Sequence, residues 1–286
     1  VLLDLLKSYN GVVQGKTSEL PDFSELAKIQ SNESEKDLLN NVSYVVEGLK
    51  DFNDEDIKLI LECLNIIVGG QILDLERFGP AMEGGIISSL KSEIELDDYT
   101  YRVAGCVGTF WTKMSLQHLM SLPTDKEKIF LEKGIRFGKA LQMINILRDI
   151  PEDLRFGRCY IPEEILSEHG MKPSDLLDKQ NIEKFRPLYD KYLDLTNEHL
   201  DAASDYIKMI PKGQFRLKAS CLLPVLIAQR TVTLLRTGNV LDSSDRIKVV
   251  REEIKKYAKK IIKALLIPGG VKRLLEKNKD SPDKLL

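Results

Sequence analysis

The stretch GKALQMINILRDIPEDLRFGRCYIP, residues 138–162, decides which fold the rest of the chain is expected to have. At helical period its polar side chains share one face, because they follow one another at steps of three, four and four residues: Gln142, Asn145, Asp149 and Asp153. The positions between them are mostly apolar, so the polar stripe is the narrow part of the helix surface. Because unpaired carboxylates are unstable in a dry core, the pattern predicts a buried helix whose stripe faces a water-containing cavity.

Asp149 and Asp153 are candidate ligands of a metal ion. Carboxylates four residues apart on one helix face lie within about 6 Å of each other. This spacing suits Mg²⁺, which takes a few carboxylate oxygens and completes its shell with water or phosphate oxygens. Arg148, Arg155 and Arg158 bracket the pair with guanidinium groups that can grip a diphosphate. The alternative is a solvated acidic helix end held by intrahelical salt bridges, since the D-x-x-x-D spacing is weak by itself.

The same spacing occurs at two other places, which shows how weak it is. Asp190 and Asp194 fit it, as do Asp201 and Asp205. Both pairs lie in a segment dense in Lys, Asp, Asn and Glu, which favours a solvated helix face. The pair within residues 138–162 has apolar surroundings instead, so we interpret that pair as the candidate site.

Residues 142–162 resemble the second aspartate-rich motif of the squalene and phytoene synthases, a family that joins two prenyl diphosphates head to head. The family pattern is roughly Q-x-x-N-I-x-R-D-x-x-E-D-x-x-x-G-R-x-Y-x-P, and the chain matches it at eleven fixed positions. These are Gln142, Asn145, Ile146, Arg148, Asp149, Glu152, Asp153, Gly157, Arg158, Tyr160 and Pro162. Upstream, residues 99–108 (YTYRVAGCVG) resemble the Y-x-x-x-V-A-G-x-V-G of the same family.

The resemblance implies roles for individual side chains, with Asp149 and Asp153 as the ligands of Mg²⁺. The catalytic residues that it implies are Tyr99, Arg148, Asp149 and Asp153. The substrate-binding residues that it implies are Val103, Gly105, Gly108, Gln142, Asn145, Arg158 and Tyr160. For Tyr99 and for the two glycines, Gly105 and Gly108, a purely structural role is the alternative. Tyr99 is otherwise a packed tyrosine near a helix start, and the two glycines are otherwise places where another helix approaches closely.

The resemblance extends to the second half of the chain and bears on the product. Residues 224–231 resemble the P-x-x-x-A-x-x-T of squalene synthases, and residues 245–251 (DRIKVVR) resemble a basic element near which those enzymes handle diphosphate and NADPH. This implies that two farnesyl diphosphates pass through presqualene diphosphate to squalene, with hydride from NADPH and with Lys248 and Arg251 at the cofactor. From the residues alone, Lys248 and Arg251 at a helix start are more often surface charge.

Two other functions stay open. The first is a phytoene, dehydrosqualene or hydroxysqualene synthase, which needs no reductant. The second is a non-enzymatic helical module whose acidic stripe binds a basic partner.

The expected fold is all-α, a single-domain helical bundle of the isoprenoid synthase type with a central cavity. Helices are expected at residues 35–49, 54–79, 96–120, 126–148, 182–209 and 216–236. Pro151 predicts that the central helix kinks or ends near the aspartates, and Gly157 predicts a pliable flap over the site, formed by residues 155–162.

The expected domain spans residues 1–278, and residues 279–286 are expected to form a frayed tail. The family carries a first aspartate-rich motif a little upstream of the position of Val1. We therefore expect the domain to be N-terminally incomplete and to lack half of its metal site.

The composition excludes some classes of protein. Of the 286 residues, 43% are hydrophobic and 30% are charged, and the net charge of −2 gives no reason to expect nucleic acid as a partner. No stretch reaches the roughly 18 unbroken apolar residues of a membrane span. Four scattered cysteines without a C-x-x-C pair indicate reduced thiols and a cytoplasmic location. The tail from Lys255 is a basic amphipathic helix that could rest on a membrane surface, and the sequence indicates no oligomeric state.

Overall fold

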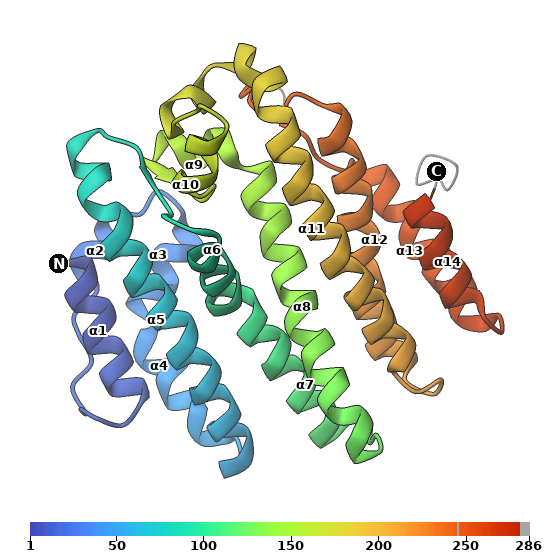
Figure 1. Ribbon diagram of the computed structural model, residues 1–286. Helices are drawn as coiled ribbons and strands as arrows, with labels where there is room; N and C mark the ends of the chain where they lie inside the picture. The colour runs from blue at the N-terminus through green and yellow to red at the C-terminus, as the bar shows by residue number, and fades with distance from the viewer. Residues whose placement is uncertain (245, 281–286) are drawn as a thin grey trace. The chain divides into compact units, whose positions relative to one another are not determined.

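The computed structural model of the chain describes residues 1–244 and 246–280, which are predominantly helical (Figure 1). This confirms the all-α class expected from the sequence. The chain forms two compact units, Val1–Glu76 and Arg77–Leu286.

The first unit consists of short helices followed by most of one long helix. Its elements are α1 (Leu2–Val13), α2 (Ser24–Lys28), α3 (Glu33–Asn40), α4 (Val42–Glu47), the 3₁₀ turn η1 (Gly48–Asp51) and α5 (Asp54–Gly84), which continues into the second unit. The helix expected at 35–49 is interrupted at Asn41. The Asn41 side chain donates to the carbonyl oxygen of Asp37 at 2.8 Å, and such local bonds compete with helix continuation.

The second unit contains most of the long helices and the two stretches that resemble the family motifs, residues 99–108 and 142–162. After α5 its helical elements are α6 (Glu93–Thr100), the π-helical η2 (Tyr101–Gly105), α7 (Cys106–His118), α8 (Thr124–Arg148), α9 (Ile150–Arg155), α10 (Glu163–Glu168), η3 (Pro173–Leu177), η4 (Lys179–Asn181), α11 (Ile182–Met209), α12 (Phe215–Thr237), α13 (Arg251–Leu266) and α14 (Gly270–Asp280). The bounds of α11 are those expected from the sequence, and the ends of α8 and α12 lie within two residues of the expected ones.

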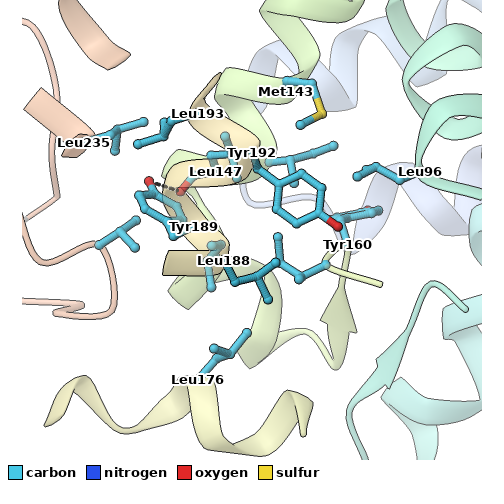
Figure 2. Packing of buried hydrophobic residues seen from close by; sticks show 14 of the residues in the cluster. Leu96, Met143, Leu147, Tyr160, Leu176, Leu188, Tyr189, Tyr192, Leu193 and Leu235 are labelled. Carbon is cyan, nitrogen blue, oxygen red and sulfur yellow. Dashed lines mark hydrogen bonds between the residues drawn. The ribbon is translucent and has the colours of Figure 1, made fainter. Parts of the chain in front are cut away.

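The core of the second unit forms where α8 and α11 lie side by side (Figure 1). One cluster of buried residues surrounds Leu147 and Tyr189 (Figure 2). The Tyr189 hydroxyl donates to the Leu147 carbonyl oxygen at 3.0 Å, which satisfies a polar group that burial would otherwise leave unpaired. A second cluster includes Tyr206, whose ring stacks on that of Phe130 with the centroids 3.9 Å apart.

Glycines allow α8 to approach α7 and the preceding η2 at backbone distance. A Cβ atom added to Gly108 would overlap the carbonyl oxygen of Gly134, and one added to Gly138 would overlap that of Ala104. Close helix approach, one of the two explanations offered for the spaced glycines, therefore holds at Gly108.

Within the described residues one helix, α12, is long and apolar enough to cross a membrane by length and composition alone. More than half of its apolar window is buried inside the protein, where α12 packs against α8, α11, α13 and α14. The core helix of a bundle has the same composition, so we describe α12 as a core helix.

The flap expected at residues 155–162 is not formed, and this expectation was wrong. Residues Arg158–Cys159 form β2, which pairs in parallel with β1 (Ser88–Ser89), and the three residues from Cys159 to Ile161 are buried. Gly157 has a φ of 72°, a left-handed conformation that glycine adopts freely and that turns the chain from α9 into β2. Glycine therefore marks a tight turn here, and the apolar residues that follow anchor the segment.

The frayed tail expected from residue 279 falls largely outside the described residues. Lys279 belongs to α14, and its ammonium group donates to the carboxylate of Asp201 at 2.7 Å. Residues 281–286 lie outside the part of the chain that the structure describes.

Candidate active site

Asp149 lies at the junction of two helices. Helix α8 ends at Arg148, and the short helix α9 begins at Ile150 with Pro151 in its first turn. The backbone N–H of Asp153 still donates to the Asp149 carbonyl oxygen at 2.9 Å, so a helical path continues through the junction. Helix α8 nevertheless ends at Arg148, beside Asp149, as Pro151 predicts.

Two arginines hold the carboxylate of Asp149. Arg148 binds it with both arms of its guanidinium group, Nε to Oδ1 at 2.8 Å and Nη2 to Oδ2 at 2.5 Å. The Nη2 atom of Arg246 donates to Oδ1 at 2.8 Å and lies 3.5 Å from Oε2 of Glu152. Asn145 joins the cluster, because its Oδ1 accepts a hydrogen bond from Arg148 Nη2 at 3.1 Å.

This arrangement keeps Asp149 ionised. Partial burial by itself would raise the pKa of the carboxyl group, but the hydrogen bonds and charges of Arg148 and Arg246 outweigh it and lower the pKa below its ordinary value. The hydrogen bond to Asp149 correspondingly raises the pKa of Arg148. Asp149 is thus an anion held between two cations.

Arg246 reaches Asp149 from the segment between α12 and α13. Val240, Leu241 and Ile247 of this segment pack into the core cluster around Leu147, which positions the segment against α8 and α9. Between the segment and the helix junction lies a cleft of about 200 Å³, lined on its charged side by Arg148, Asp149, Glu152, Arg155, Asp242 and Arg246. Lys248 and Arg251, the residues implied by the resemblance, have exposed side chains and do not line this cleft.

The second aspartate has different surroundings. Asp153 is half-buried and lines a small pocket together with Arg158 and Tyr160. Among residues 1–244 and 246–280, no group of three or more His, Cys, Asp or Glu side chains is placed to hold a metal ion. A metal held here would therefore need ligands beyond the carboxylates of this cluster.

The two tyrosines of the candidate site lie against each other. Tyr99, near the end of α6, stacks on Tyr160 with ring centroids 4.5 Å apart and an interplanar angle of 27°. The edge of Phe78 completes the group, with its centroid 5.3 Å from that of Tyr160. The structure thus brings together two residues that are far apart in the sequence and that the resemblance implies for substrate binding and catalysis.

An apolar cavity of about 390 Å³ opens along α8. Its lining residues come from η2, α7, α8, α11 and α12: Val103, Ala104, Val107, Gly108, Trp111, Gly134, Phe137, Gly138, Leu141, Tyr206, Ser220, Cys221 and Pro224. Val103 and Gly108 of the implied prenyl-binding residues are among them. Gly105 is buried and does not line the cavity. A Cβ atom added there would face the Tyr101 side chain at 3.0 Å.

One face of α8 joins this cavity to the arginine–aspartate cluster. Gly134, Gly138 and Leu141 line the cavity, and steps of four from Leu141 lead along the same face to Asn145 and Asp149. At 1.5 Å per residue, Leu141 and Asp149 are about 12 Å apart along the helix. The face is therefore apolar at one end and charged at the other, with the partly exposed Gln142 beside the boundary.

The sequence model of the squalene/phytoene synthase family matches residues 13–253. The chain belongs to the squalene/phytoene synthase family. The members of this family are prenyltransferase-type enzymes that condense prenyl diphosphates head to head.

Curated relatives of this family member carry the name phytoene synthase. Phytoene synthase 2 of Solanum lycopersicum is 28% identical over 231 residues, which cover 78% of this chain and 69% of the relative. The 15-cis-phytoene synthase of Synechocystis is 29% identical over 160 residues, 54% of this chain and 44% of that protein. The bifunctional lycopene cyclase/phytoene synthase of Colletotrichum graminicola is 35% identical over 118 residues, which are 41% of this chain and only 20% of the fungal protein.

Solved structures of squalene synthases share the fold of this family member. The structure of TcSQS with the ligand BPH1237 gives a TM-score of 0.72 at 17% identity and covers 97% of this chain and 79% of that one. The squalene synthase HpnC of Alicyclobacillus acidocaldarius gives a TM-score of 0.54 at 16% identity, with coverages of 82% and 72%. At these identities the likeness shows the fold alone.

Arg246 is not among the site residues predicted from the sequence, although the run DRIKVVR contains it. A helix start was expected in this run, whereas α13 begins only at Arg251. In the non-helical segment before α13, Ile247 packs into the core, and Arg246 beside it reaches Asp149. Arg246, Ile247 and Lys248 alternate between polar and apolar, which is typical of an extended segment with one buried side. This alternation was the signal in the sequence, and the expectation of a helix left it unused.

Proposed function

We propose that this member of the family joins two farnesyl diphosphates head to head, through presqualene diphosphate, to squalene, with NADPH as the reductant. The proposal is supported by one observation above the others: a single face of α8 carries both the wall of an apolar cavity and the arginine-braced carboxylate. A prenyl diphosphate matches this arrangement, because it consists of an apolar chain that ends in a strongly charged group.

The donor set fits Mg²⁺ bound together with a diphosphate. Asp149 and Asp153 offer hard carboxylate oxygens, and Mg²⁺ commonly binds one or two carboxylates and takes phosphate and water oxygens for the rest. Asp149 and Asp153 would hold the ion. When bound, the ion neutralises negative charge that develops on the departing diphosphate.

The other side chains of the site bind, orient and exclude water. Arg148 and Arg158 grip the diphosphate, because a guanidinium group matches phosphate oxygens two at a time. Gln142 and Asn145 orient the diphosphate by hydrogen bonds. The apolar lining around Phe137 keeps water from the reactive carbon. Tyr99 assists removal of a proton or anchors the diphosphate.

In this proposal Lys248 and Arg251 bind the phosphate groups of NADPH. Both side chains are exposed and near the segment that carries Arg246, so they are accessible to a dissolved cofactor. Their role is confined to the reductive half of the reaction and does not affect the first condensation.

A second candidate function is synthesis of phytoene, dehydrosqualene or hydroxysqualene without a reductant. The phytoene synthase names of the relatives that match by sequence favour it. The two candidates share the first condensation and differ in the length of the substrate or in the fate of the cyclopropyl intermediate.

Product analysis separates the candidates. The full-length protein is incubated with farnesyl or geranylgeranyl diphosphate, with and without NADPH, and the products are separated by chromatography. Squalene formed from farnesyl diphosphate only when NADPH is present supports the proposal. A preference for geranylgeranyl diphosphate, or dehydrosqualene or hydroxysqualene formed from farnesyl diphosphate without NADPH, supports the second candidate. No condensation of either substrate in the presence of Mg²⁺ would contradict both.

A further inference from the structure

The helix pair α13–α14 carries a surface that the proposed chemistry does not use. The inner side of α13 is buried through Tyr257 and Ile261. Its outer side exposes large apolar side chains where the two helices meet, with Ile262 62%, Leu266 76% and Ile267 51% exposed. Figure 1 shows the turn between α13 and α14 at one end of this helix pair, which is drawn in orange-red and red. These three side chains do not contribute to the core, because the buried residues on the inner face of α13 make the contacts with it.

Positive charge surrounds the apolar tip. Residues 251–280 contain ten lysines and arginines and four acidic residues. Lys259 and Lys263 lie on the same outer face of α13 as Ile262 and Leu266, because residues three and four apart share a helix face. Within the described part of the chain, neither lysine takes part in an ion pair.

Farther along the pair the lysines are crowded enough to affect one another. Burial and the neighbouring charges of Lys277 and Lys256 lower the pKa of Lys260. Three of the four acidic residues of the segment are engaged by cations other than Lys259 and Lys263: Glu252 by Lys255, Glu253 by Arg230 and Glu276 by Lys272. The tip is therefore both apolar and locally cationic.

We propose that the α13–α14 tip, formed by Ile262, Leu266 and Ile267 with Lys259 and Lys263, docks on an anionic lipid bilayer. The three apolar side chains enter the boundary between headgroups and acyl chains, and the two lysines contact anionic headgroups. A second copy of the chain is a poorer occupant, because it would bring the same lysines against one another. Docking is independent of the proposed reaction and is measured without it.

The test is co-sedimentation of the full chain with vesicles. One set is phosphatidylcholine alone, and the other contains phosphatidylglycerol in addition. The protein is expected to bind the anionic vesicles at least about tenfold more tightly than the neutral ones, and binding is expected to weaken as salt is raised. Ile262→Ser with Leu266→Ser, and separately Lys259→Glu with Lys263→Glu, should each weaken binding to anionic vesicles at least about tenfold.

Two control variants carry the same kinds of substitution at exposed positions outside α13 and α14. Ile94→Ser with Leu177→Ser removes two exposed apolar side chains, 81% and 56% exposed, and Lys50→Glu with Lys58→Glu makes the same change in net charge. Both should bind vesicles within about twofold of the unchanged protein. Circular dichroism verifies that every variant is folded.

Three results would overturn the proposal. The first is absence of binding to anionic vesicles by the unchanged protein, and the second is unchanged binding by folded tip variants. The third is a dimer, seen by analytical ultracentrifugation, that Ile262→Ser with Leu266→Ser dissociates while vesicle binding persists. That result would assign the tip to a contact between copies of the chain.

Discussion

Arg246 and Asp149 are 97 residues apart in the sequence, and a hydrogen bond of 2.8 Å joins Nη2 of the arginine to Oδ1 of the aspartate. Arg148 occupies the same oxygen and the second one as well. Both oxygens of Asp149 are therefore engaged by guanidinium groups. A cation that binds Asp149 competes with these arginines for the carboxylate, and a diphosphate that arrives with the cation offers a displaced arginine a new anionic partner.

Replacing Arg246 should change the titration of Asp149. Because the pKa of Asp149 in the folded protein lies below its ordinary value, its ionised form stabilises the fold above that value, and this contribution is lost as the pH falls through the folded pKa. Arg246→Met removes one of the two cations and should raise the pKa of Asp149, so the loss begins at higher pH. Carbon-13 NMR of the aspartate carboxyl groups measures this shift. Lys248→Met is the control, since Lys248 lies outside the cleft, and an equal shift in both variants would contradict the role of Arg246.

Replacing either aspartate of the candidate site should lower the rate of turnover strongly. Asp149→Asn and Asp153→Asn each remove a negative charge that the proposed magnesium site needs, and we expect a loss of about 100- to 1000-fold in kcat with the fold intact. Steady-state assays of the full-length protein at saturating Mg²⁺ measure this. Asp194→Asn is the matched control, because Asp194 has the same D-x-x-x-D spacing and a side chain 69% exposed. Near-normal turnover in both site variants would disprove the metal assignment.

Replacing the exposed basic pair should affect only the reductive half of the reaction. In Lys248→Ala with Arg251→Ala, presqualene diphosphate should accumulate at saturating NADPH, while consumption of farnesyl diphosphate changes less than about twofold. Chromatography of the products at several times measures both quantities. An unchanged yield of squalene would show that Lys248 and Arg251 are surface charges without a role in the reaction. Such charges contribute about 0–1 kcal/mol each to stability.

Adding one methyl group between α7 and α8 should destabilise the fold. Gly108→Ala places a Cβ atom on the carbonyl oxygen of Gly134, and overpacking of this kind typically costs about 1–3 kcal/mol. The free energy of unfolding, measured with urea, should fall by this amount. Gly79→Ala in α5 is the control, because no heavy atom lies within 4 Å of its added Cβ, and alanine should there stabilise the helix by up to about 1 kcal/mol. Equal effects would show that the two helices are not in backbone contact.

Much of the helical framework was predictable because helical periodicity is strong in long segments. The bounds of α11 follow from its pattern, and the end of α8 follows from Pro151, which cannot donate the hydrogen bond that would continue the helix. The sequence singled out Arg148 and Asp149, but it assigned Arg148 to the diphosphate and did not predict the contact between the two side chains.

The remaining features depend on contacts between distant segments. Arg246 reaches Asp149 because Ile247 packs into the core, and no local pattern around residue 246 specifies that partner. The parallel pairing of residues 88–89 with residues 158–159 is too short to show strand alternation, so Gly157 suggested a flap where the structure has an anchored turn. Tyr99 and Tyr160 stack only because this pairing fixes the second of them beside α6.

The glycine contacts between α7 and α8 have a consequence for the evolution of chain-length preference. At Gly108 and Gly138, which press against the neighbouring backbone, the cavity lining has no side chain to exchange for a larger or smaller one. The lining from α11 and α12 consists of side chains, among them Tyr206 and Cys221. A library that randomises the α12 side should therefore yield many folded variants with altered substrate length, whereas one that randomises the glycines should yield mostly unfolded protein.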